Sequence, residues 1–243
     1  MKIVRCTTPE DLGEQAATLI ASQINEAIAA NGEARIVLST GASQFTTLAA
    51  LIKKDIDWQK VTLFHLDEYV GLGEQHPASF VKYMKERFVS KVNLKAVHYV
   101  APWNYPSVDA CIADLTALIR EKPIDVGVIG IGENTHIAFN DPPADFDNRG
   151  AYKVVELDER CRKQQLGEGW FPTFDDVPKQ AISMTPYQIM LCKKIVSPVP
   201  YKVKAEAIYK VLTSDVTNMI PATLLKTHPD ATTFIDQDSG SRV

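Results

Sequence analysis

The sequence predicts an α/β fold built on a doubly wound, mostly parallel sheet, and three observations support this prediction. Short apolar and β-branched segments recur along the chain, among them residues 34–38, 61–66 and 125–129. Segments with apolar residues at helical spacing separate these strands. Polar residues and glycines follow directly after several of the strands. Alternating strands and helices are typical of parallel βαβ units, so we expect one Rossmann-like domain over residues 1–243 with helices on both faces of the sheet.

The predicted elements begin with a strand at residues 2–6. The helix that follows has the hydroxyl cap Thr8, Pro9 in its first turn, and Gly32 at its end. The other strands are expected at 34–38, 61–66, 97–99, 125–129, 181–185, 194–196 and 232–235, and the other helices around 48–52, 80–88, 108–120 and 202–212. The polar and irregular stretch at about 157–178 is long for a compact domain, and we expect a lid there.

The composition is that of an ordinary globular protein, with 45% hydrophobic and 23% charged residues. The net charge is −4 and like charges form no block, so we expect no nucleic-acid partner and no membrane partner. No apolar stretch approaches the ~20 residues of a membrane span. The dispersed histidines and cysteines (Cys6, Cys111, Cys161, Cys192) show no metal or redox spacing, which predicts no metal site and reduced thiols in a cytoplasmic protein.

The first of three polar segments after predicted strands is residues 39–43, Ser-Thr-Gly-Ala-Ser. Glycine permits a close backbone approach, and hydroxyls with free N–H groups at the start of a helix can hold a phosphate. The segment lacks the GxxxxGK[ST] and GxGxxG patterns, so neither a P-loop nor a dinucleotide site is predicted. It is interpreted either as an ordinary strand–helix turn or as part of an anion site.

The second segment is Asp67-Glu68, at the end of the strand predicted at 61–66. Adjacent side chains of an extended chain point to opposite sides, so one carboxylate can face a crevice while the other is structural. A carboxylate at a buried strand end, with its pKa set by its neighbours, suits proton abstraction next to a carbonyl. The alternative interpretation is a pair of solvated acids in a loop.

The third segment, residues 130–143, contains a histidine among polar side chains, directly after the apolar strand at 125–129. Ligands of open α/β sheets bind in the crevice beyond the carboxyl ends of the strands. His136 is therefore a candidate catalytic residue, and Asn134, Asn140 and Asp141 are candidates to fix its tautomer. The alternative is a structural histidine.

These segments occur in an order and spacing that resemble the glucosamine-6-phosphate deaminase (isomerase) family, within the larger group that includes 6-phosphogluconolactonases. The resemblance covers essentially the whole chain. The matching segments are residues 39–43, 66–72 and 130–142, then Lys204-Ala205 and residues 227–229. The sequence His-Ile-Ala-Phe-Asn at 136–140 is closer to the deaminase branch than to the lactonase branch.

The resemblance implies a role for each candidate. Asp67 matches the general base that moves a proton between C2 and C1 of the opened sugar, and His136 matches the histidine that assists ring opening. Asp141 occupies the place of an acid that supports this histidine, and Asn134 lies in the same motif. The predicted substrate and phosphate ligands are Ser39, Thr40, Gly41, Ser43, Glu68, Lys204 and Arg160. The family's lid arginine aligns with Gln165, and Arg160 and Arg162 lie close by in the sequence.

The resemblance also implies the reaction. We expect conversion of glucosamine 6-phosphate to fructose 6-phosphate and ammonia, without a redox cofactor or a required metal, by an enzyme classed as a hydrolase acting on an amino sugar phosphate. The partner is then a small sugar phosphate, and a homo-oligomer stays open.

Two residues depart from the family pattern within its most specific motif. Asn134 stands where an acid is usual and Thr135 where a glycine is usual. If the backbone there needs a positive φ angle, Thr135 should strain it. Two alternatives to the deaminase therefore stay open: a 6-phosphogluconolactonase-type enzyme, which would release no ammonia, and a sugar-phosphate binder without catalytic activity.

Overall fold

The computed structural model describes residues 1–167 and 169–243, except for the side chains of Arg160 and Gln164. Its main sheet is parallel throughout. The strands run in the order β1 (Lys2–Arg5), β10 (Ala231–Ile235), β9 (Lys194–Val199), β6 (Val126–Val128), β2 (Ala34–Leu38), β3 (Val61–His65) and β5 (Ala96–His98). The predicted α/β fold class with a mostly parallel sheet is confirmed.

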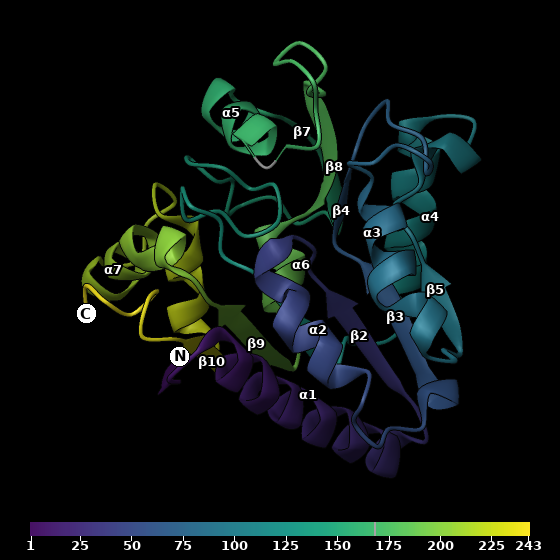
Figure 1. Ribbon diagram of the computed structural model, residues 1–243. Coiled ribbons are helices and arrows are strands. Elements are labelled where there is room, and N and C mark those ends of the chain that lie inside the picture. The colour runs from purple at the N-terminus through teal and green to yellow at the C-terminus, as the bar shows by residue number, and fades with distance from the viewer. Residues whose placement is uncertain (168) are drawn as a thin grey trace.

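Helices cover both faces of this sheet (Figure 1). They are α1 (Pro9–Asn31), α2 (Phe45–Leu51), α3 (Phe80–Arg87), α4 (Val108–Arg120), α6 (Pro186–Met190) and α7 (Ala205–Thr213). Neighbouring residues of β2 show the two faces. Ile36 and Leu38 pack in the core beneath α1 and α2, whereas Val37 packs in the core on the other face, with α4 and α7. Alternate side chains of a strand point to opposite faces, so a strand covered on both sides is apolar throughout.

The long helix α1 begins and ends where the sequence predicts. The Thr8 hydroxyl accepts a hydrogen bond from the Asp11 backbone N–H at 3.1 Å. Gly32 ends the helix with a φ angle of 78°, a left-handed conformation that glycine adopts without steric cost.

A second sheet, which the sequence did not predict, rises from the carboxyl end of the first. It is antiparallel and consists of β4 (Asp67–Tyr69), β8 (Gln180–Met184) and β7 (Tyr152–Glu156). The strand expected at 181–185 therefore belongs here, and β7 was not predicted at all. These strands are short, and β4 pairs with β8 across more than a hundred residues of chain, so this pairing leaves no local signal. Helix α5 (Glu159–Gly167) lies above this end of the molecule (Figure 1).

The strand order brings distant loops together. From β2 the chain continues to β3 on one side, whereas β6 and β9 lie on the other. The boundary between β2 and β6 is therefore a topological switch point, where ligands of open α/β sheets bind. The segments after β9, β6, β2 and β3 lie side by side at this edge. In the part of the chain that the structure describes, no helix is both long and apolar enough to cross a membrane.

Candidate active site

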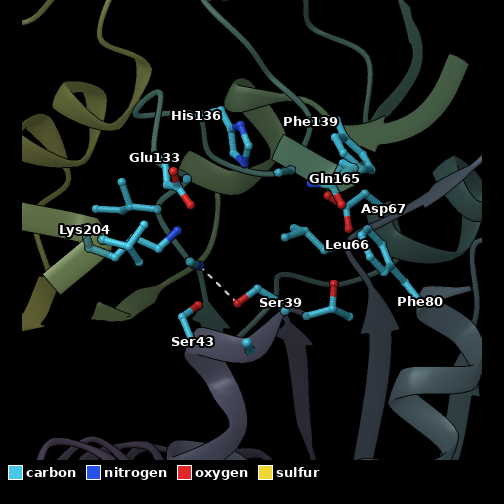
Figure 2. A pocket seen from close by; sticks show the side chains of 18 of the residues that line it. Ser39, Ser43, Leu66, Asp67, Phe80, Glu133, His136, Phe139, Gln165 and Lys204 are labelled. Atoms are coloured by element: carbon cyan, nitrogen blue, oxygen red, sulfur yellow. Dashed lines mark hydrogen bonds between the residues drawn. The ribbon is translucent and has the colours of Figure 1, made fainter. Parts of the chain in front are cut away.

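A cavity of about 250 Å³ lies beyond the carboxyl ends of these four strands. Figure 2 shows Asp67 and Gln165 on one side of it, Lys204 on the other, and His136 at the top of the view. The structure thus brings together three segments that are far apart in the sequence. The predicted site residues that line the cavity are Ser39, Thr40, Gly41, Ser43, Asp67, His136 and Lys204.

Asp67 is the first residue of β4 and is 5% exposed. Burial, with a smaller contribution from the negative charge of Glu68, raises the pKa of Asp67 to about 8. Burial has this effect because it disfavours the charged form of a carboxyl group. A carboxyl group with its pKa near neutrality is suited to take up a proton and to return it.

Glu68 faces away from the cavity, and the prediction that it binds substrate is corrected by its contacts. Its carboxylate accepts hydrogen bonds from the Tyr69 N–H at 2.9 Å, the Ser79 hydroxyl at 2.9 Å and the Val81 N–H at 2.8 Å. It therefore ties β4 to the start of α3. Burial raises the pKa of Glu68 to about 7 in spite of these hydrogen bonds. Alternation along the extended chain explains why the two adjacent acids separate.

His136 is held by a polar network on the loop after β6. Its Nδ1 lies 2.9 Å from Asp141 Oδ1, and the Asn134 side-chain amide donates to the same oxygen at 2.7 Å. The Asn134 Oδ1 accepts from the His136 backbone N–H at 3.1 Å. Burial alone would raise the pKa of Asp141, but the hydrogen bonds from His136 and Asn134 hold it below its usual value. Asp141 and Asn134 therefore stand behind the histidine and do not line the cavity.

The backbone of this loop is strained at residues that carry side chains. Thr135 has a φ angle of 73° and Ala138 one of 50°, both in the left-handed region. A left-handed conformation costs a residue with a side chain roughly 1–2 kcal/mol. The expectation that Thr135 strains this position agrees with its φ angle. Gly132 is required nearby, because a Cβ atom there would lie 2.3 Å from His136 Nε2.

The loop after β2 forms the opposite end of the cavity. The Ser39 hydroxyl accepts a hydrogen bond from the Gly130 N–H at 3.0 Å and so ties this loop to the one after β6. Gly41, with a φ angle of 98°, turns the chain into the helical turn Ala42–Gln44. Lys204, at the end of the turn Lys202–Lys204, brings a positive charge to the same end although its side chain is largely buried. Hydroxyls, backbone N–H groups and an ammonium group suit an anion.

Helix α5 contributes Gln165 to the cavity. The Tyr69 hydroxyl donates a hydrogen bond of 2.6 Å to the side-chain oxygen of Gln165. The guanidinium of Arg162 instead donates to the carbonyls of Val177 and Phe174, so it ties α5 to the segment that follows it. Arg160, a predicted phosphate ligand, lies outside the described side chains.

Several cavity residues were not predicted from the sequence. They are Phe80, Tyr201 and Val203, among others. No sequence pattern marks these residues, because a lone aromatic or aliphatic side chain is more often part of a core. Among them, Tyr201 has an unusual backbone conformation, with a φ angle of 81°, but this angle is visible in the structure and not in the sequence.

Together these features suit acid–base chemistry on a small anionic ligand. A buried carboxyl group and a histidine that is hydrogen-bonded to an aspartate lie at one cavity with a cationic, hydroxyl-rich end. The chain belongs to the family of glucosamine-6-phosphate isomerases/6-phosphogluconolactonase, whose model matches residues 7–234.

Individual relatives place the chain within this family. It is 33% identical to glucosamine-6-phosphate deaminase 1 of Bacillus subtilis, with 99% of each chain covered. It is 32% identical to the glucosamine-6-phosphate deaminase of Streptococcus uberis over the full length of both. The solved structure of a monomeric glucosamine-6-phosphate deaminase superposes with a TM-score of 0.89 at 32% identity, covering both chains completely. A 6-phosphogluconolactonase from Thermotoga maritima shares the fold, with a TM-score of 0.78 at 14% identity, over 97% of this chain and 99% of that one.

These relatives correct one expectation. The enzyme class expected from the sequence was a hydrolase acting on an amino sugar phosphate. The relatives are named as deaminases and the family as isomerases, so the class is corrected from a simple hydrolase to an isomerase and deaminase.

Proposed function

We propose that this protein isomerises and deaminates glucosamine 6-phosphate, giving fructose 6-phosphate and ammonia. One observation supports this most directly: Asp67, His136 and the anion-binding end of the cavity lie in a single space of the right kind for a hexose phosphate. Full-length relatives at 32–33% identity carry the same activity in their names.

The anion-binding end would hold the phosphate. Ser39, Thr40, Gly41 and Ser43 offer hydroxyl and backbone donors, and Lys204 offers a charge, at a distance from Asp67. Binding at a remote group orients the reacting carbons and lowers the entropic part of the barrier. Because the phosphate does not react, these contacts contribute to positioning rather than to proton transfer.

His136 would open the pyranose ring. It would take the proton of the C1 hydroxyl and return a proton to the ring oxygen as the C1–O5 bond breaks. Asp141 accepts the hydrogen bond of His136 Nδ1 and keeps Nε2 available for this exchange. Asn134 is uncharged and hydrogen-bonds to both His136 and Asp141, so it keeps the two residues in position.

Asp67 would then carry out the isomerisation. It removes the proton from C2, and the C–H electron pair forms the C1–C2 double bond of an enolamine. The electron pair of the C1 carbonyl moves to O1, which takes up a proton. Asp67 returns its proton to C1 and the nitrogen releases one proton, so C1 becomes an alcohol and C2 an imine. Water replaces nitrogen at C2, and ammonia leaves as fructose 6-phosphate forms. Because the pKa of Asp67 is about 8, the same carboxyl group can take up the proton and return it.

The experiment is an ammonia-release screen with hexosamine 6-phosphates, with fructose 6-phosphate measured in parallel. We expect equal amounts of both products from glucosamine 6-phosphate and little turnover of glucosamine without phosphate. An Asp55→Asn variant, which changes an exposed carboxylate elsewhere, is the matched control and should keep full activity. Hydrolysis of 6-phosphogluconolactone without ammonia release would replace this function by the lactonase one. Binding without any turnover would leave a sugar-phosphate binder.

We also propose that residues 157–178 act as a lid, because Cys161, Leu166 and Phe171 pack with Tyr69 over the Asp67 side of the cavity.

We further propose a cytoplasmic location, since all four cysteines are buried thiols without a disulfide.

A further inference from the structure

The lid segment brings a cysteine to the catalytic histidine. Cys161, near the start of α5, is fully buried and lies against Asp141. One ligand atom each from His136, Asp141 and Cys161 lies within 4.8 Å of the other two. Across residues 1–167 and 169–243, no other three histidine, cysteine or acidic side chains meet in this way. No spacing in the sequence predicted this cluster, because Cys161 is 20 residues from Asp141 along the chain.

The donor atoms of this cluster suit zinc. An imidazole nitrogen, a carboxylate oxygen and a sulfur are ligands that Zn²⁺ takes in proteins, with a tetrahedral geometry completed by a fourth ligand. The side chain of Asp141 is only 10% exposed. Its Oδ2 is buried and has no hydrogen-bond partner among the described residues, and the Cys161 thiol lies against the same carboxyl group. An acceptor of this kind gains more from a cation than from a weak S–H donor.

We propose that His136, Asp141 and Cys161 form an inhibitory zinc site that couples the lid to the ring-opening histidine. Zn²⁺ binds the Nδ1 lone pair of His136, an oxygen of Asp141 and the Cys161 thiolate, and a water molecule is the fourth ligand. The thiol proton and the proton between Nδ1 and Asp141 pass to the solvent. No electron is transferred, so chelation of the metal reverses the reaction.

Two consequences follow from the position of the ligands. The metal takes the place of the proton that Asp141 shares with His136, so the histidine loses its acid–base function. It also links α5 to the loop after β6, which fixes the lid against the site. The inhibitory effect rests on the proposed deaminase function, whereas the metal site itself does not.

The activity test is a Zn²⁺ titration of ammonia release by protein pretreated with a chelator. We expect inhibition that excess chelator reverses. The variants Cys161→Ser and Cys161→Ala should each raise the half-inhibitory Zn²⁺ concentration at least roughly tenfold, because one of three protein ligands is weakened or lost. Each variant is compared with its own metal-free activity. The matched control is Cys6→Ser, a buried thiol outside the cluster, which should leave zinc sensitivity unchanged. Equal sensitivity in all four proteins would overturn the proposal.

The binding test uses Co²⁺ as an optical probe and needs no activity. Tetrahedral cobalt bound to a thiolate shows a sulfur-to-metal charge-transfer band in the near ultraviolet. We expect this band with the wild-type protein and with Cys6→Ser, its displacement by Zn²⁺, and its loss in both Cys161 variants. Thermal unfolding confirms that each variant is folded. A wild-type protein without the band would contradict the site, even if the enzyme is active, and an inactive protein with the band would contradict only the proposed function.

Discussion

Two aspartates near the same cavity have opposite electrostatic surroundings. Asp67 is buried beside another carboxyl group, and its pKa is raised to about 8. Asp141 is also largely buried, but hydrogen bonds from His136 and Asn134 keep its pKa below the usual value. Both residues are aspartates, so the difference between their pKa values comes from the hydrogen-bond donors around each carboxylate.

This difference separates two roles. Groups whose surroundings push their pKa values apart mark the acid–base assignments of a site. A carboxyl group that titrates near neutrality can exchange a proton with substrate, whereas one that stays ionised can only orient and support a histidine. Substitutions at each residue test whether Asp67 and Asp141 have these separate roles.

Replacing Asp67 by Asn should lower kcat roughly 10²–10⁴-fold, because the group that transfers the proton is lost. Steady-state ammonia release measures this loss, and substrate KM should change little. Thermal unfolding provides the control for folding. The raised pKa of Asp67 means that the folded protein binds its proton more tightly than the unfolded chain, so the wild type loses stability as pH rises toward 8. Asn does not ionise, so at pH 9 the variant should be at least as stable as the wild type.

Replacing Asp141 by Asn should cost less, roughly 10- to 100-fold in kcat. The charge-assisted hydrogen bond to His136 is lost, but the histidine remains, and hydrogen bonds to charged groups contribute about 1.5–3 kcal/mol. Ammonia release measures the effect, with the Asp55→Asn protein as the matched carboxylate-to-amide control. A loss as large as that of Asp67→Asn would argue that Asp141 itself transfers a proton.

The pH dependence of kcat/KM should follow the ionisation of Asp67. Because its pKa lies at about 8, only a minority of the carboxyl is ionised in the free protein at pH 7. We expect kcat/KM to rise roughly tenfold between pH 7 and pH 9 and then level off, since the ionised form is the base. A profile that is already flat between pH 6 and pH 9 would contradict the raised pKa.

Replacing Glu68 by Gln should have the smallest effect on rate and should move the pH profile. Loss of the neighbouring negative charge lowers the pKa of Asp67, so the rise in kcat/KM should occur at a lower pH than in the wild type. The variant Ser79→Ala, which removes one donor to Glu68 and leaves its charge, is the matched control. An unchanged profile in Glu68→Gln would mean that burial alone sets the pKa of Asp67.

The parts of this site that local sequence could predict are those at strand ends. Asp67, His136 and the loop at 39–43 follow apolar strands directly, and a parallel sheet brings such ends to one edge. Alternation also anticipated that only one of Asp67 and Glu68 would face the cavity, although Glu68 was still expected among the ligands.

What local sequence could not predict depends on pairing across the chain. The second sheet joins β4 to β8, and it is this sheet that carries Tyr69 beneath α5 and so positions Gln165. Cys161 shows no metal-ligand spacing in the sequence, yet helix α5 places it against Asp141. Asn134 was expected beside His136, but its bridge between the Asp141 carboxylate and the His136 backbone N–H could not be predicted, because it depends on the turn of the loop.

If Asp67 is the base, it moves a proton between C2 and C1 of the substrate. Incubation of glucosamine 6-phosphate deuterated at C2 with the enzyme, followed by NMR of the substrate and the fructose 6-phosphate, follows this proton. We expect deuterium at C1 of the product or exchanged into water with the wild type, and neither with Asp67→Asn, although that variant still binds substrate. Transfer or exchange at the wild-type rate in Asp67→Asn would contradict the assignment of the base.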